Sequence, residues 1–129
     1  MDPVKSPVET LPVLIVADDL IWSSRLRAAV DRAGTTSLVA RTANELATAL
    51  SEASARSPVI VDLNGRGYDG VDAIRAAAEA GHPVLAVGQH EDLELRRRAL
   101  AAGARRVFSY NKLFSDGPAV VTSLLEGNL

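Results

Sequence analysis

The sequence predicts a doubly wound α/β domain, in which helices cover both faces of a parallel β-sheet. Two observations lead to this prediction. Short aliphatic runs without polar alternation recur along the chain, as in strands that are buried on both faces of a sheet. Segments with apolar residues at helical spacing separate these runs. By the right-handed crossover rule, five strands alternating with five helices form one parallel sheet between two helical layers.

The first half of the chain supplies two strands and two helices. The first strand is the aliphatic run at 13–16, which stops just before Asp18 and Asp19. Apolar residues at helical spacing follow from Trp22 to position 33, ahead of a glycine. A second strand is predicted at 37–40. Thr42 and Glu45 match a capping box, which predicts the start of a second helix.

The second half repeats the same alternation. A buried run again ends at a carboxylate, Asp62, and a glycine-rich loop follows it. Each later strand is bounded by turn residues, and each later helix has an apolar face. The predicted elements are, in order, a strand at 58–61, a helix at 71–78, a strand at 83–87, a helix at 93–102, a strand at 106–110 and a helix at 118–126.

Length and composition favour one domain. The chain has 129 residues, and we expect residues 1–10 to be a flexible lead and residues 11–129 to form a single domain. A net charge of -2 gives no reason to expect nucleic-acid binding. The lack of cysteine fits a reducing cytoplasm, and no segment reads as a secretory signal or a membrane span. We therefore expect a cytoplasmic protein.

Candidate site residues stand at the predicted carboxyl ends of the strands. In open parallel sheets, ligands bind beyond these ends. Asp18, Asp62, Gly88 and Tyr110 all fall there. Two carboxylates from different strands would form an acidic pocket suited to Mg²⁺, and a carboxylate beside Mg²⁺ can accept a phosphoryl group.

These residues resemble the response-regulator receiver domains from residue 11 to residue 125. Asp62 follows Asp18 by 44 residues and precedes Gly70 by 8, as in that family. The resemblance implies a flavodoxin-like sheet in the order 2-1-3-4-5. It also implies that Asp62 is the phospho-acceptor, and that Asp18, Asp62 and the backbone carbonyl of Asn64 bind a metal ion. Mg²⁺ is the expected cofactor, bound weakly, with Asp19 as a further possible ligand.

Three positions depart from the family pattern. Ala17 stands in place of an acid, Gly88 in place of a serine or threonine, and Tyr110 in place of a lysine. A glycine offers no hydroxyl to a phosphoryl group, and a phenol lacks the positive charge that stabilises the transfer. Tyr110 is therefore expected to pack as an aromatic residue rather than to report phosphorylation.

Two alternatives would restore parts of the pattern. Asp18 and Asp19 could be the acid pair if the strand register differs by one residue. Lys112 could be the missing lysine if the fifth strand holds an insertion.

Five arginines gather late in the sequence. A charge run is often only a solvated helix face. The resemblance also implies a partner or homodimer surface formed by the predicted elements at 93–102, 106–110 and 118–126. These residues are Arg96, Arg97, Arg98, Arg105 and Arg106.

The sequence thus predicts a stand-alone, atypical receiver domain in bacterial two-component signal transduction. It would be a non-enzymatic module that contacts a histidine kinase or a downstream effector, with weak or absent phosphorylation control. The alternative is an active phosphorelay phosphoprotein that is phosphorylated at Asp62 with Mg²⁺. A flavin or nucleotide binder is disfavoured, because Asp18 and Asp19 would repel a phosphate and no glycine-rich phosphate cradle is present.

Overall fold

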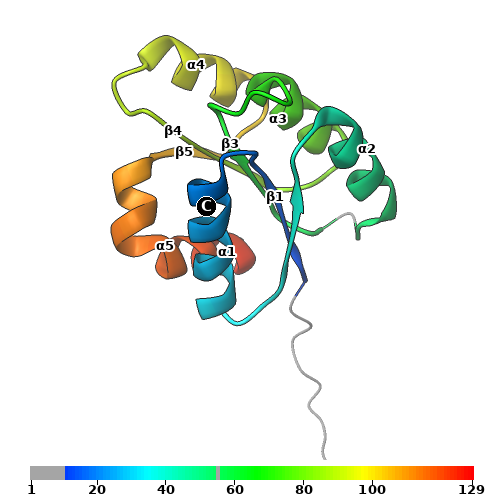
Figure 1. The fold of residues 1–129 in the computed structure, drawn as a ribbon, viewed down its shortest axis with the longest axis vertical. Helices are drawn as coiled ribbons and strands as arrows, with labels where there is room; N and C mark the ends of the chain where they lie inside the picture. Colours follow the sequence, from blue (N-terminus) through cyan, green and yellow to red (C-terminus); the bar gives the residue numbers. More distant parts are fainter. Residues whose placement is uncertain (1–10, 55) are drawn as a thin grey trace, which may run out of the picture.

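A computed structural model describes residues 11–54 and 56–129, so the predicted flexible lead at 1–10 lies outside the described residues. One parallel sheet in the order β2-β1-β3-β4-β5 lies between helices on both faces (Figure 1). The predicted fold class and strand order are confirmed. None of the helices in the described ranges is long and apolar enough to cross a membrane. The elements are β1 (Val13–Val16), α1 (Leu20–Arg32), β2 (Ser37–Ala40), α2 (Ala43–Glu52), β3 (Val59–Asp62), α3 (Gly70–Glu79), β4 (Val84–Gly88), α4 (Leu93–Ala102), β5 (Arg106–Ser109) and α5 (Tyr110–Leu125).

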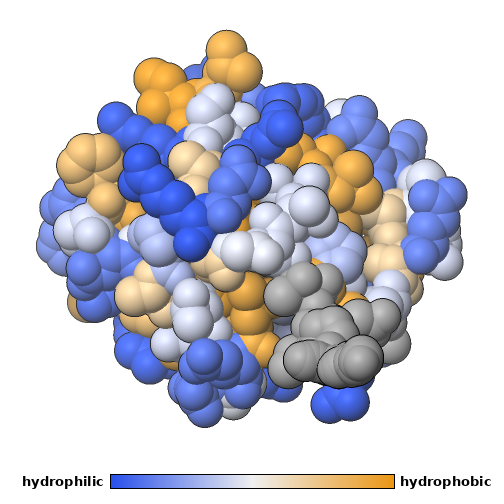
Figure 2. Space-filling view, turned by 90° about the horizontal axis from the view of Figure 1, so that it is seen from below, coloured by the Kyte–Doolittle hydropathy of each residue, from blue (hydrophilic) through white to orange (hydrophobic). Residues whose placement is uncertain are grey.

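Both faces of β1, β3 and β4 are buried, which explains their continuous aliphatic sequences. Helices α2, α3 and α4 cover one face, and α1 and α5 cover the other (Figure 1). Along β1, Leu14 and Val16 pack under the first group, while Val13 and Ile15 pack under the second. Polar side chains on these strands are therefore tolerated only where a strand ends. Hydrophobic residues reach the surface seen from below in separate patches among hydrophilic ones (Figure 2).

The predicted capping box at the start of α2 is confirmed. The hydroxyl oxygen of Thr42 accepts a hydrogen bond from the backbone N–H of Glu45 at 3.1 Å. The Glu45 carboxylate in turn accepts from the backbone N–H of Arg41 at 2.7 Å. Thr42 satisfies an amide that the helix start leaves free, and Glu45 bonds the amide just before the cap, so the boundary between β2 and α2 is set locally.

The predicted end of the chain was wrong in two respects. Strand β5 ends at Ser109 rather than at Tyr110, and α5 begins at Tyr110 rather than at Pro118. The Ser109 side chain accepts from the backbone N–H of Lys112 at 3.1 Å and caps α5. The helix is kinked at Asp116, with φ -127° and ψ 23°, two residues before the proline. Because proline favours the first turn of a helix, the sequence pattern predicts only the part of α5 that follows the kink.

Removing a central side chain should test the packing of the sheet. Ile60 in β3 is 0% exposed, so Ile60→Ala should lower the free energy of unfolding by about 2–5 kcal/mol. Leu38 in β2 is 54% exposed, and Leu38→Ala is the matched control, with a change within about 0.5 kcal/mol. Urea denaturation measures both. Equal losses for the two variants would contradict this burial pattern.

Candidate functional site

The centre of the candidate site is the carboxylate of Asp62, the last residue of β3. Its residue is only 2% exposed, although it stands at the carboxyl edge of the sheet. Oδ1 accepts a hydrogen bond from the backbone N–H of Asn64 at 3.1 Å. The same oxygen accepts a short hydrogen bond from the hydroxyl of Tyr110. A loop amide and a phenol thus supply the donors that a buried carboxylate requires.

Tyr110, the first residue of α5, both packs and hydrogen-bonds. Its hydroxyl donates to Asp62 and accepts from Nδ2 of Asn64 at 2.9 Å. Its ring lies against Trp22 of α1, with centroids 4.5 Å apart and planes tilted by 36°. The expectation that Tyr110 mainly packs was incomplete, since its hydroxyl also bonds directly to the site carboxylate. The sequence did not reveal this because no local pattern encodes a contact between residues 48 positions apart.

Burial dominates the protonation chemistry of the site. It raises the pKa of Asp62, and the nearby charges of Asp19 and Asp18 raise it further, against the hydrogen bonds from Tyr110 and Asn64. Burial and the bond to Asp62 also raise the pKa of the Tyr110 hydroxyl. The phenol therefore remains a proton donor at neutral pH, and its hydrogen bond favours the ionised form of Asp62.

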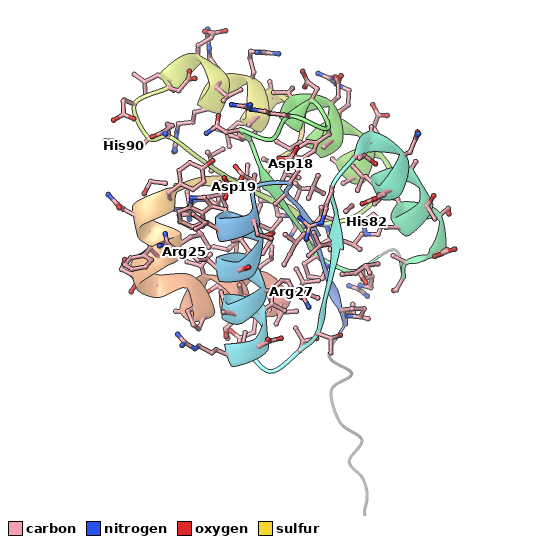
Figure 3. All side chains as sticks on the ribbon, in the orientation of Figure 1. Asp18, Asp19, Arg25, Arg27, His82 and His90 are labelled. Atoms are coloured by element: carbon pink, nitrogen blue, oxygen red, sulfur yellow. The ribbon has the colours of Figure 1, made fainter. Side chains whose placement is uncertain are left out.

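The two aspartates after β1 have different partners. Oδ2 of Asp18 accepts from the backbone N–H groups of Arg66 and Gly67, at 2.8 and 2.6 Å, and so fixes the loop between β3 and α3. Asp19 is the N-cap of α1 and accepts from the backbone N–H of Trp22 at 2.8 Å. Figure 3 shows both aspartates at the same end of β1, beside the start of α1. Asp19 therefore caps α1, and Asp18 holds the loop between β3 and α3.

Tyr68 is a site residue that the sequence analysis missed. It is 7% exposed, and its hydroxyl shares one proton between the main-chain carbonyls of Asp62 at 2.6 Å and Val16 at 3.0 Å. A Cβ at Gly65 would lie 2.1 Å from the Tyr68 ring, so only glycine fits against it. An aromatic residue among glycines in a polar loop was the available signal. The phenol ties β1 to β3 directly beneath Asp62.

The geometry of the fold has close counterparts among solved structures. A response regulator receiver domain protein from Methanospirillum hungatei JF-1 is 19% identical with a TM-score of 0.79, over 93% of this chain and 97% of that one. A response regulator from Thermotoga maritima is 20% identical with a TM-score of 0.76, over 92% and 99%. This chain has the receiver-domain fold. No family model and no curated protein matches the sequence.

A third counterpart with the receiver-domain fold carries ligands. It is a response regulator protein from Burkholderia pseudomallei with a phosphorylated aspartic acid, a calcium ion and citrate. It is 18% identical with a TM-score of 0.72, over 91% of this chain and 70% of that one. At this level of identity the likeness concerns the fold, and the roles of the site residues have to be argued from their own chemistry.

Within this receiver fold, the three departing positions lie around the carboxyl edge of the sheet. Ala17 is 0% exposed and packs in the core beside α1 and α5. Gly88 ends β4, and with Tyr110 it lines a small cavity of about 150 Å³. Lys112 does not take the place of the missing lysine, because its ammonium group pairs with Asp116 on α5 at 2.9 Å. The group that contacts Asp62 is therefore a neutral phenol.

Some of the oxygen atoms predicted to hold Mg²⁺ already accept hydrogen bonds within the protein. One oxygen of Asp18 accepts from two amides, and one oxygen of Asp62 accepts from an amide and a phenol. Within residues 11–54 and 56–129, no three His, Cys, Asp or Glu side chains gather closely enough to hold a metal ion. These bonds engage one oxygen of each carboxylate, and Mg²⁺ binding by Asp18, Asp62 and the Asn64 carbonyl stays a prediction.

The five arginines do not form one free positive patch. Arg96 donates to a main-chain carbonyl of β5 at 2.9 Å, and Arg97 forms an ion pair within α4. Arg106 lies over an aromatic ring of β5, 4.9 Å from its centroid. Arg105 lines a cavity of about 710 Å³ near the residues that precede β3 and β4, while Arg98 is exposed on α4. Their role as a partner surface stays a prediction.

Replacing the phenol should reveal how far the ionised Asp62 depends on it. Tyr110→Phe should lower the free energy of unfolding at pH 7 by about 1.5–3 kcal/mol, the usual contribution of a hydrogen bond to a charged group. The loss should shrink at acid pH, where Asp62 is protonated. Tyr68→Phe is the matched control, because its carbonyl partners do not titrate and its cost should not vary with pH. Urea denaturation at a series of pH values separates the two.

Removing the charge of Asp62 should stabilise the fold. The folded state raises the pKa of Asp62 above its unfolded value. The stability that Asp62 contributes is therefore fully present below the unfolded pKa and is lost as pH rises through the folded pKa. Asp62→Asn should therefore raise the free energy of unfolding at pH 7, with a gain that disappears as pH falls. The exposed Asp31→Asn should change little. A variant less stable than the wild type at pH 7 would contradict the electrostatic account.

Proposed function

We propose that this receiver-fold protein acts in bacterial signal transduction by protein–protein contact, with weak or absent phosphorylation control at Asp62. The observation that carries the proposal is the hydrogen bond from the Tyr110 hydroxyl to the Asp62 carboxylate. The neutral Tyr110 hydroxyl thus occupies the position in which a cation would favour phosphoryl transfer. The module is proposed to be non-enzymatic.

Access and electrostatics both argue against ready phosphorylation. Asp62 is 2% exposed, so a phosphodonor can reach it only after Tyr110 moves aside. The attack would then proceed without an ammonium group, which commonly costs about 10² to 10³ in rate. Gly88 would also offer no hydroxyl to a phosphoryl oxygen, and a modification with no differential contact cannot shift a conformational equilibrium.

A face beside the site is suited to a partner. Ile21 on α1 and Phe114 on α5 are large apolar residues that are 61% and 66% exposed. The Arg25 guanidinium lies between the two helices, 5.1 Å from the Trp22 ring centroid and 4.7 Å from that of Phe114; Figure 3 shows it there. Exposed apolar and arginine side chains together are typical of protein interfaces. The proposed partner is a histidine kinase or a downstream effector, and a homodimer through α4, β5 and α5 stays a second prediction.

The second candidate function is an active phospho-acceptor. It is favoured by the position of Asp62, which ends β3 within the field of Asp18 and Asp19. The response regulator from Burkholderia pseudomallei with the same fold contains a phosphorylated aspartic acid. The two candidates make opposite predictions for a simple chemical experiment.

Incubation with acetyl phosphate and Mg²⁺, followed by mass spectrometry of the intact protein, should show no phosphoryl adduct on the wild type. Tyr110→Lys, alone or with Gly88→Ser, should gain an adduct, since an ammonium group can restore about 10²-fold in transfer rate. Adding Asp62→Asn to either variant should abolish it. A wild-type adduct that disappears in Asp62→Asn would establish the phospho-acceptor instead.

A further inference from the structure

Strand β2 is an edge strand whose outer side is open for pairing. Among the described residues, 11–54 and 56–129, it neighbours only β1 in the sheet. The carbonyls of Thr36 and Ala40 accept from amides on the β1 side at 2.9 and 3.1 Å. Because successive residues of a strand turn their backbone groups to opposite sides, Ser37 and Val39 direct their N–H and C=O groups away from the sheet. Two donor and acceptor pairs are thus available to another strand.

The β2 edge is short, but it lacks the other usual protections against pairing. Natural edge strands carry charges, prolines or bulges that keep other strands away. The β2 sequence Ser-Leu-Val-Ala has neither a charge nor a proline, and Leu38 is 54% exposed. The opposite edge strand, β5, begins with the exposed Arg106, whose guanidinium lies over the Phe108 ring. One edge of the sheet is therefore charged and the other is open and apolar.

A groove runs beside this open edge. It has a volume of about 400 Å³ and lies between β2 and α2. Leu38, Val39, Ala40 and Ala49 give it an apolar lining, and its only charged lining residues are Glu45 and Glu52. Helix α2 contains no lysine or arginine. The rim of the groove is therefore acidic.

We propose that the β2 edge and this groove bind an extended, basic segment of a partner protein as an added strand. Such a segment would hydrogen-bond to the backbone of Ser37 and Val39, and its alternate side chains would enter the groove beside Leu38. Its lysine or arginine residues would pair with Glu45 and Glu52. A second copy of the chain is a poorer occupant, because its own α2 would bring two further glutamates against the single Arg41 that lies between β2 and α2. The surface is separate from Asp62 and does not depend on the function proposed for it.

A fluorescein-labelled peptide, Lys-Val-Lys-Val-Lys-Val-Lys, tests the surface by fluorescence polarisation against the full chain. It should bind, and the same peptide with glutamate in place of lysine should not. Leu38→Lys should weaken binding about tenfold or more, because it places a like charge on the edge. Leu93→Lys is the matched control on α4, where Leu93 is 69% exposed, and it should bind like the wild type. Circular dichroism checks that both variants stay folded.

Charge reversal gives an independent readout. Glu52→Lys should weaken binding of the lysine peptide and allow binding of the glutamate peptide. Asp62→Asn should change the binding of neither peptide. The amide NMR signals of Ser37 and Val39 should shift with the peptide. Absence of binding, equal binding of the two peptides, or full binding by Leu38→Lys would overturn the proposal. Self-association of the wild type that Leu38→Lys abolishes would also overturn it and would assign the edge to a second copy.

Discussion

A carboxylate at the buried end of a central strand requires hydrogen-bond donors, and this requirement determines the structure around the carboxyl edge of the sheet. Asp62 is nearly inaccessible, and the donors come from Asn64 in the next loop and from Tyr110 at the start of α5. Leaving such a group without donors would cost more than a typical hydrogen bond contributes. The first turn of α5 and the loop after β3 are therefore held by the same carboxylate.

The loop after β3 is also tied to β1, so the site is joined to the core on two sides. The Tyr68 hydroxyl bridges the carbonyls of Asp62 and Val16, and Asp18 accepts from two loop amides. A switching site needs groups that contact its ligand differently in two states. Here one oxygen of Asp62 and one oxygen of Asp18 are bonded to the protein itself. This arrangement supports the proposal that the molecule acts by contact with a partner rather than by phosphorylation.

The candidate site at the carboxyl edge of the sheet and the proposed binding surface at the β2 edge use different parts of the molecule. The carboxylates gather at the tips of β1 and β3, while β2 offers free backbone groups and an acidic groove beside α2. The arginines, which the sequence places close together, are spread over one ion pair, a carbonyl contact, an aromatic ring and a cavity wall. Their proximity in sequence therefore does not make a continuous surface, because neighbouring positions on a helix and a strand point in different directions.

The sequence by itself determined the fold class, the strand order through a family resemblance, the capping box at Thr42 and the placing of Asp18 and Asp62 at strand ends. These features follow from local periodicity and from spacing along the chain. Only the tertiary structure decided that Tyr110 donates to Asp62, that Tyr68 fills the space beneath it, and that α5 begins before its proline. The first two outcomes depend on contacts between segments that are far apart in the sequence. The third depends on the Ser109 cap, which lies in a run of residues typical of a strand. No local pattern could therefore specify them.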